Sequence, residues 1–211
     1  MGNEKKIAMI ISHKHKFIYV KAIKVAGTSA EYFLERICGE DDIVTPIEPA
    51  ESELHTPRNY SQRGIYNHLV LSDLFQKIPS ELFKDYRIVV NERNTWARVA
   101  SFYNMWVCRK FSKIVLPFKF FIKEKHIGSV CDAATHQGEI LVTDWIRFSH
   151  LHSDLIKFCE ALNVDCKNIP CLHTKNYPRK HYTEYYDDET REIVAEKYAK
   201  DIEYFGYKFG E

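Results

Sequence analysis

FIYVKAIKVAGTSAEYF, residues 17–33, is the stretch that decides how this chain folds. Its first half is rich in β-branched and aromatic residues and predicts a buried strand over residues 16–23. Apolar residues then recur at helical spacing and predict a helix over about residues 28–38. Gly27 stands between the two segments. A strand that turns through a glycine into a helix is expected to present the helix start, with its unpaired N–H groups, above the end of a sheet.

The same alternation continues along the chain. Further strands are expected over residues 86–91 and 144–149. Helices are expected over residues 72–83 with a break at Pro79, and over residues 95–111, 117–126, 152–162 and 187–201. Residues 40–66 are predicted to form a long loop. This order favours an α/β fold, a three-layer sandwich with helices around a central, mainly parallel sheet.

Composition narrows the class of protein. The 211 residues suit one domain, residues 1–211, and the 30 basic and 29 acidic residues give a net charge of +1. No global field is therefore expected to recruit nucleic acid or an anionic membrane. The sequence has no apolar run long enough for a membrane span, and its first apolar patch is too short for a signal peptide, so we expect a cytoplasmic protein. The six cysteines lack disulfide or zinc spacing, which predicts reduced thiols and no metal site.

The junction around Gly27 carries groups that suit an anion. Lys24 supplies a positive charge, and Thr28 and Ser29 add hydroxyl donors at the start of a helix. Gly27 lacks the Cβ that would keep an anion away. The order differs from the common phosphate loop, in which Lys follows the glycines and directly precedes Ser or Thr. A capping box between Thr28 and Glu31 is the alternative explanation, but it leaves Lys24 unexplained.

A second junction follows the strand predicted over residues 86–91. Arg93 stands where this strand ends, and Arg98 and Ser101 share one face of the following helix. Converging guanidiniums and a hydroxyl would make a second anion site, because Arg binds phosphate through two N–H groups at once. For Arg98, a solvated or internally paired side chain is an equal alternative.

Together the two stretches resemble the nucleotide-binding segments of the sulfotransferase superfamily. Residues 24–29, KVAGTS, are similar to its 5′-phosphosulfate loop, and residues 93–103, RNTWARVASFY, to its 3′-phosphate segment. Residues 146–155 and 185–209 resemble the late strand, turn and ending of the carbohydrate sulfotransferase branch, called sulfotransferase family 2-like. The departures are Ile23, Thr95 and Ala97 at positions where the family has Pro, Pro and Asp, and Glu92, where it has an apolar residue.

The resemblance implies a sheet like that of P-loop nucleotide kinases and a reaction in which 3′-phosphoadenosine 5′-phosphosulfate (PAPS) gives a sulfuryl group to a small-molecule or glycan hydroxyl, without a metal. It assigns Lys24 to catalysis and His68 as the base, with Glu31 and Glu53 as weaker candidates for the base. The nucleotide-binding residues that it implies are Lys24, Val25, Ala26, Gly27, Thr28, Ser29, Arg93, Arg98, Ser101, Lys175 and Arg179. An ATP-dependent kinase of the same architecture and a non-catalytic nucleotide-binding module remain alternatives.

Overall fold

The computed structural model describes residues 9–46, 55–61, 70–108, 116–170 and 180–211. Its main sheet is built from strands β1 to β4 and β7, and a separate hairpin pairs β5 with β6. The strands are β1 (Met9–Ser12), β2 (Phe17–Val20), β3 (Ile43–Val44), β4 (Arg87–Glu92), β5 (Thr135–His136), β6 (Glu139–Ile140) and β7 (Asp144–Arg147).

The expected helices form with small shifts at their ends. The α-helices are α1 (Gly27–Glu35), α2 (Leu71–Lys77), α3 (Thr95–Cys108), α4 (Phe118–Glu124), α5 (Val130–Ala133), α6 (Leu151–Ala161), α7 (Asp188–Lys197) and α8 (Ala199–Phe205). Short 3₁₀ helices are η2 (Ser80–Phe83), η3 (Phe148–His150) and η4 (Tyr182–Tyr185). The break at Pro79 is confirmed, because α2 and η2 lie on either side of it.

The sheet has the strand order β3-β1-β2-β4-β7. β2 pairs with β4 and β4 pairs with β7 in parallel, whereas β1 runs antiparallel to both β2 and β3. The expectation of parallel pairing is confirmed for the three predicted strands, but the whole sheet is mixed. The sequence reading missed β1 and β3; Ile43 and Val44 fall inside the segment expected to be a loop, where they pair with β1.

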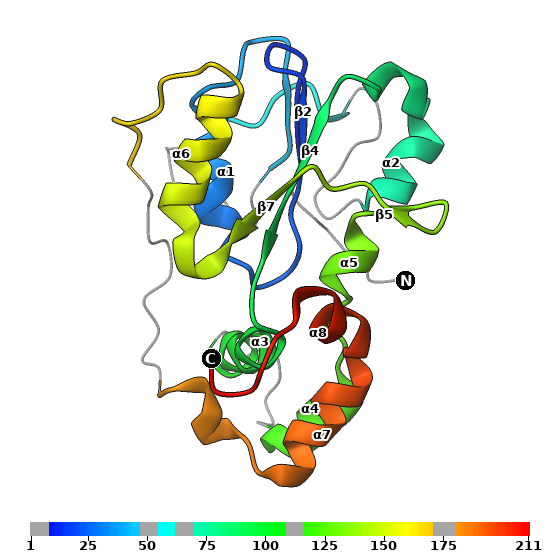
Figure 1. The fold of residues 1–211 in the computed structure, drawn as a ribbon, viewed down its shortest axis with the longest axis vertical. Helices are drawn as coiled ribbons and strands as arrows, with labels where there is room; N and C mark the ends of the chain where they lie inside the picture. Colours follow the sequence, from blue (N-terminus) through cyan, green and yellow to red (C-terminus); the bar gives the residue numbers. More distant parts are fainter. Residues whose placement is uncertain (1–8, 47–54, 62–69, 109–115, 171–179) are drawn as a thin grey trace.

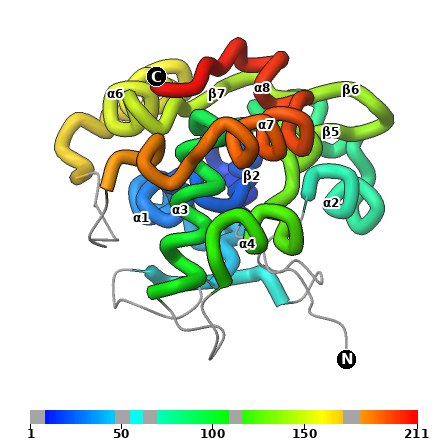
Figure 2. The backbone as a smooth tube through the Cα atoms, turned by 90° about the horizontal axis from the view of Figure 1, so that it is seen from below, coloured from blue at the N-terminus to red at the C-terminus, as the bar shows by residue number. Residues whose placement is uncertain are grey.

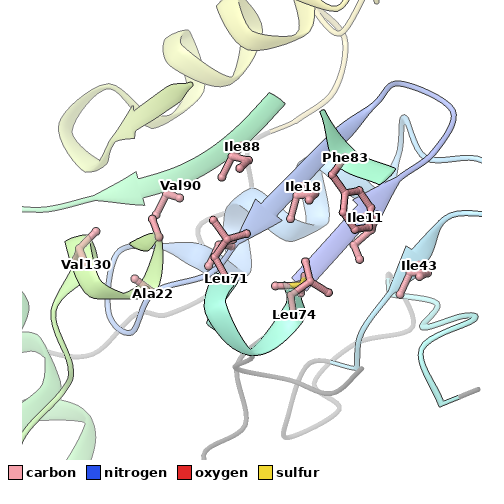
Figure 3. Packing of buried hydrophobic residues seen from close by; sticks show 14 of the residues in the cluster. Ile11, Ile18, Ala22, Ile43, Leu71, Leu74, Phe83, Ile88, Val90 and Val130 are labelled. Carbon is pink, nitrogen blue, oxygen red and sulfur yellow. The ribbon is translucent and has the colours of Figure 1, made fainter. Parts of the chain in front are cut away.

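Helices cover both faces of this sheet (Figure 1). On one face, the side chains of Ile18 and Val90 pack with Leu71 and Leu74 of α2, as Figure 3 shows. On the opposite face, α1 and α6 pack against the alternate residues of the same strands. That second cluster includes Phe17, Tyr19, Val89, Phe33, Leu34, Leu155 and Phe158. The alternation of strand side chains therefore builds one core on each side.

A third apolar cluster lies beyond the end of β4. Helices α3, α4, α7 and α8 gather there, beneath the sheet in Figure 1 and nearest the viewer in Figure 2. Trp96 and Val99 of α3 meet Phe121, Val194 and Tyr198 in this cluster. The helical group thus covers the carboxyl ends of the parallel strands, where α/β proteins place their ligands.

The last predicted helix is corrected to two helices. Tyr198 leaves the helical conformation, with φ −125° and ψ 27°, and its ring is 4% exposed. Its hydroxyl accepts a hydrogen bond from the N–H of Ile127 at 3.2 Å. Tyr198 separates α7 from α8, and Asp201 in the first turn of α8 accepts hydrogen bonds from two N–H groups of α5.

Candidate functional site

The loop between β2 and α1 holds an unusual backbone. Lys24 has φ 66° and Ala26 has φ 64°, both in the left-handed region. A non-glycine residue costs about 1–2 kcal/mol in this conformation, and such strain gathers at ligand-binding sites. Ala26 is also the N-cap of α1, and no side chain caps the helix there. The N–H of Ser29 already donates to the carbonyl of Ala26 at 3.0 Å, so the N–H groups of Gly27 and Thr28 are the ones left for another acceptor.

Thr28 and Ser29 lie in the first turn of α1 and are largely buried. The capping-box alternative for Thr28 is wrong, because the N-cap is Ala26. Its supposed partner, Glu31, instead forms a buried ion pair with Lys21. Neither hydroxyl is thus explained by capping, which leaves both in place to donate to an anion at the helix start.

The Lys21–Glu31 pair lies directly below the loop and was not expected from the sequence. Lys21 is 8% exposed and Glu31 is fully buried. Burial raises the pKa of Glu31, although the charge and hydrogen bond of Lys21 act in the opposite direction. Glu31, a weaker candidate for the base, is therefore enclosed and already paired.

Gly27 is needed for a packing reason that the sequence alone does not show. Its φ is not positive, and a Cβ there would lie 2.3 Å from the Cγ of Lys21. The glycine thus lets the stem of Lys21 pass beneath the start of α1 on its way to Glu31. Close approach of this lysine is thus what the geometry requires, and close approach of an anion stays a prediction.

Arg93 connects the second junction to the first. Its Nη1 donates to the carbonyl oxygen of Lys24 at 3.3 Å. Its Cζ lies 3.9 Å from the ring centroid of Phe148, the first residue after β7. Groups from the carboxyl ends of β2, β4 and β7 therefore meet at Arg93, as the parallel register of these strands requires.

Helix α3, which follows Arg93, has a side-chain cap at its N-terminus. The side chain of Asn94 accepts a hydrogen bond from the N–H of Ala97 at 3.3 Å, so Asn94 caps α3. Ser101 lies two turns further along α3 and is 9% exposed.

Arg98 is internally paired and 1% exposed. Its Nη1 lies 3.3 Å from a carboxylate oxygen of Asp201, and its Nη2 donates to the carbonyl of Gly128. The paired alternative therefore describes Arg98, and the convergence expected between Arg98 and Arg93 is corrected. The physical reason is that α8 supplies the carboxylate of Asp201, and the segment before α5 supplies the carbonyl of Gly128, which together satisfy a buried guanidinium.

Glu92 ends β4 and is 8% exposed. Burial raises its pKa to about 7, while Arg147 lowers it and Asp154 raises it further. The register places Glu92 opposite Arg147 on β7. The charged neighbours of Glu92 therefore belong to β7 and α6.

Other expected residues fall outside the described part of the chain. These are His68, Glu53, Lys175 and Arg179. Within the described residues, no group of three His, Cys, Asp or Glu side chains could hold a metal ion. Five cysteines in this part have free thiols, and none of the described helices is both long and apolar enough to cross a bilayer.

The described arrangement is suited to binding an anion. Arg93 contacts the Lys24 loop, and this loop leads into a helix start that has no side-chain cap and two hydroxyl residues in its first turn. Backbone N–H groups and a guanidinium are the two donor types that phosphate groups prefer.

Comparison with known proteins supports the fold. Neither a protein-family model nor a curated protein matches the sequence. Among solved structures, a sulfotransferase from Alicyclobacillus acidocaldarius is similar, with a TM-score of 0.51 and 14% sequence identity. The match covers 90% of this chain and 96% of that chain. At this identity the likeness concerns the fold alone, and the chain has a mixed α/β fold similar to that of a bacterial sulfotransferase.

Proposed function

We propose that this chain is a PAPS-dependent sulfotransferase of the carbohydrate sulfotransferase-like branch, with the layered architecture of P-loop nucleotide kinases. Its reaction is the in-line transfer of a sulfuryl group to an acceptor hydroxyl, in a glycan or a small molecule. The bond between sulfur and the bridging oxygen of the 5′-phosphate breaks as the bond to the acceptor oxygen forms. Such transfers depend mainly on positioning and on stabilising the charge of the leaving phosphate.

The single observation that carries the proposal is the contact between the two anion-binding stretches. Arg93 Nη1 donates to the carbonyl of Lys24 at 3.3 Å, so the segments assigned to the two phosphates of one nucleotide are adjacent. The strained loop and the uncapped start of α1 support the same reading, because both favour a bound anion.

Each residue then has a role. The loop of Val25, Ala26 and Gly27, with the hydroxyls of Thr28 and Ser29, holds the 5′-phosphate, and Lys24 stabilises the charge that develops on it. Arg93 and Ser101 hold the 3′-phosphate. Arg98 supports this segment through Asp201 and is not proposed as a ligand.

Residues outside the described part complete the proposal. His68 takes the proton of the acceptor hydroxyl, since an imidazole with its ordinary pKa of about 6.5 suits a base at neutral pH. Lys175 and Arg179 contact the nucleotide from a late loop. Both assignments rest on the sequence resemblance.

Thermal unfolding with added nucleotide tests the proposal. We expect 3′,5′-adenosine bisphosphate at a hundred times its Kd to stabilise the protein by about 2.7 kcal/mol. Arg93→Ala should remove most of this gain, since hydrogen bonds to charged groups contribute about 1.5–3 kcal/mol. Arg87→Ala is the matched control, because Arg87 begins the same strand and pairs with Asp144 away from the junction. No gain with the bisphosphate, or a gain only with ATP and magnesium, contradicts the proposal.

Transfer itself is tested with labelled donor and a panel of hydroxyl acceptors. Lys24→Ala should lower turnover by about 10²–10³, the usual effect of removing a donor to a developing charge. Lys16→Ala is the matched control, because Lys16 also has a positive φ and precedes the same strand. If Lys24→Ala and His68→Ala both keep full turnover, these catalytic assignments are wrong.

A further inference from the structure

Phe148 leaves an apolar ring at the surface beside the proposed nucleotide site. It is the first residue after β7 and is 36% exposed. The Cζ of Arg93 lies 3.9 Å from the centre of this ring. That distance is contact between a guanidinium and an aromatic face, so the ring and the cation are packed against each other.

The contact restrains Arg93 from a second direction. One direction is already fixed, since Nη1 donates to the carbonyl of Lys24 at 3.3 Å. A ring against the face of the guanidinium fixes its plane, while the N–H groups that bind phosphate lie in that plane. Stacking and phosphate binding are therefore compatible, and the stacked side chain loses less freedom when an anion arrives.

We infer that Phe148 is a positioning residue for the phosphate-binding guanidinium of Arg93. This inference rests on the proposed function. It adds β7 to the strands that build the site. Phe148, the first residue after β7, orients the side chain of Arg93, the first residue after the neighbouring parallel strand β4. The ring acts on the nucleotide's 3′-phosphate through Arg93, not through contact with the base.

Binding of two nucleotides that differ in one phosphate tests this role. Phe148→Leu keeps an apolar side chain but removes the aromatic face. We expect it to weaken binding of 3′,5′-adenosine bisphosphate by up to about tenfold, the effect of ordering one additional long side chain on binding. Adenosine 5′-monophosphate lacks the 3′-phosphate, and its affinity should change less than twofold. Phe148→Tyr retains the face and should bind both nucleotides within twofold of the wild type.

Phe120→Leu is the matched control. Phe120 is 59% exposed and lies on α4, so this variant removes an exposed ring away from Arg93. It should leave both affinities unchanged. In an Arg93→Lys background, Phe148→Leu should weaken binding of 3′,5′-adenosine bisphosphate less than twofold, because the planar cation on which the ring acts is absent.

The outcomes separate this inference from the proposed function. If the wild type does not bind the bisphosphate, the proposed function fails and the inference fails with it. Wild-type binding with unchanged affinity in Phe148→Leu overturns the inference alone. Equal weakening of both nucleotides also overturns it, since the ring would then be a stacking platform for the purine. Unliganded melting of Phe148→Leu within a few degrees of the wild type establishes that the variant is folded.

Discussion

The two strand-to-helix junctions of this protein lie side by side and are built in opposite ways. Between β2 and α1, residues 21–26 form a loop with two left-handed residues and no side-chain cap. Between β4 and α3, only Arg93 and Asn94 intervene, and Asn94 caps the helix. At the first junction no side chain accepts from the N–H groups of the helix start, whereas at the second junction the side chain of Asn94 does.

In the proposed function, this difference means that the two junctions bind the nucleotide with different kinds of donor. An open helix start offers backbone N–H groups, whose direction is fixed by the helix. A closed helix start offers side chains instead, here Arg93 and Ser101. Each junction also has a buried ion pair, Lys21 with Glu31 below the first and Arg98 with Asp201 below the second. A buried ion pair thus supports each junction. We expect the Arg98–Asp201 pair to contribute more to the unfolding free energy, because Asp201 accepts several further hydrogen bonds.

The largest expected effect is that of Asp201→Ala. Asp201 is 1% exposed, pairs with Arg98, and accepts from Ser129 Oγ and from two backbone N–H groups of α5. Its removal leaves a buried guanidinium without its counter-charge and should cost about 3–5 kcal/mol of unfolding free energy. Urea denaturation measures this loss.

Asp132→Ala is the control for that prediction. Asp132 pairs with Lys200 at 2.5 Å, but both side chains are more than half exposed. An exposed pair contributes about 0–1 kcal/mol. If the two variants lose equal stability, the buried pair does not hold α3 to α8. The double variant Arg98→Met with Asp201→Leu should recover part of the loss, since it removes both charges.

The sequence predicted the two junctions but not what supports them. Strand and helix periodicity is local, so it located β2, β4, β7 and the helices after them. The rule for parallel sheets then placed both junctions at one edge, where Arg93 contacts Lys24. The partner of Arg98, in contrast, is 103 residues away and has no local pattern. Lys21 and Glu31 have no periodic signal either, because a charge inside a core is recognised only once its partner is known.

A smaller effect is expected for pH and Glu92. Burial raises the pKa of this carboxyl from its ordinary 4.5 to about 7, with Arg147 and Asp154 as its charged neighbours. The unfolded chain then releases this proton at lower pH than the folded chain does. The stabilising contribution is therefore complete below about pH 4.5 and is lost as the pH rises through 7. Between pH 5 and 8 the loss should be roughly 2 kcal/mol, from about 1.4 kcal/mol per pKa unit.

Glu92→Gln should remove this dependence. Relative to the wild type, the unfolding free energy of Glu92→Gln should increase as the pH rises from 5 to 8. Glu139→Gln, at an exposed carboxyl on β6, should follow the wild type throughout. A constant difference between Glu92→Gln and the wild type over this range means that Glu92 is already ionised at pH 5 in the folded protein.

The smallest effects compare the two helix starts directly. Asn94→Ala removes the cap of α3 and should cost about 1 kcal/mol. Ala26→Gly should have the opposite sign and stabilise the protein by up to about 1 kcal/mol, because glycine adopts φ 64° without the steric cost of a Cβ. Ala195→Gly, inside α7, controls for the ordinary cost of a helical glycine, about 1 kcal/mol. Loss of stability in Ala26→Gly, as large as in Ala195→Gly, would mean that the left-handed alanine is not strained. The loop would then be an ordinary helix entry, and the contrast between the two junctions would rest on the cap at Asn94 alone.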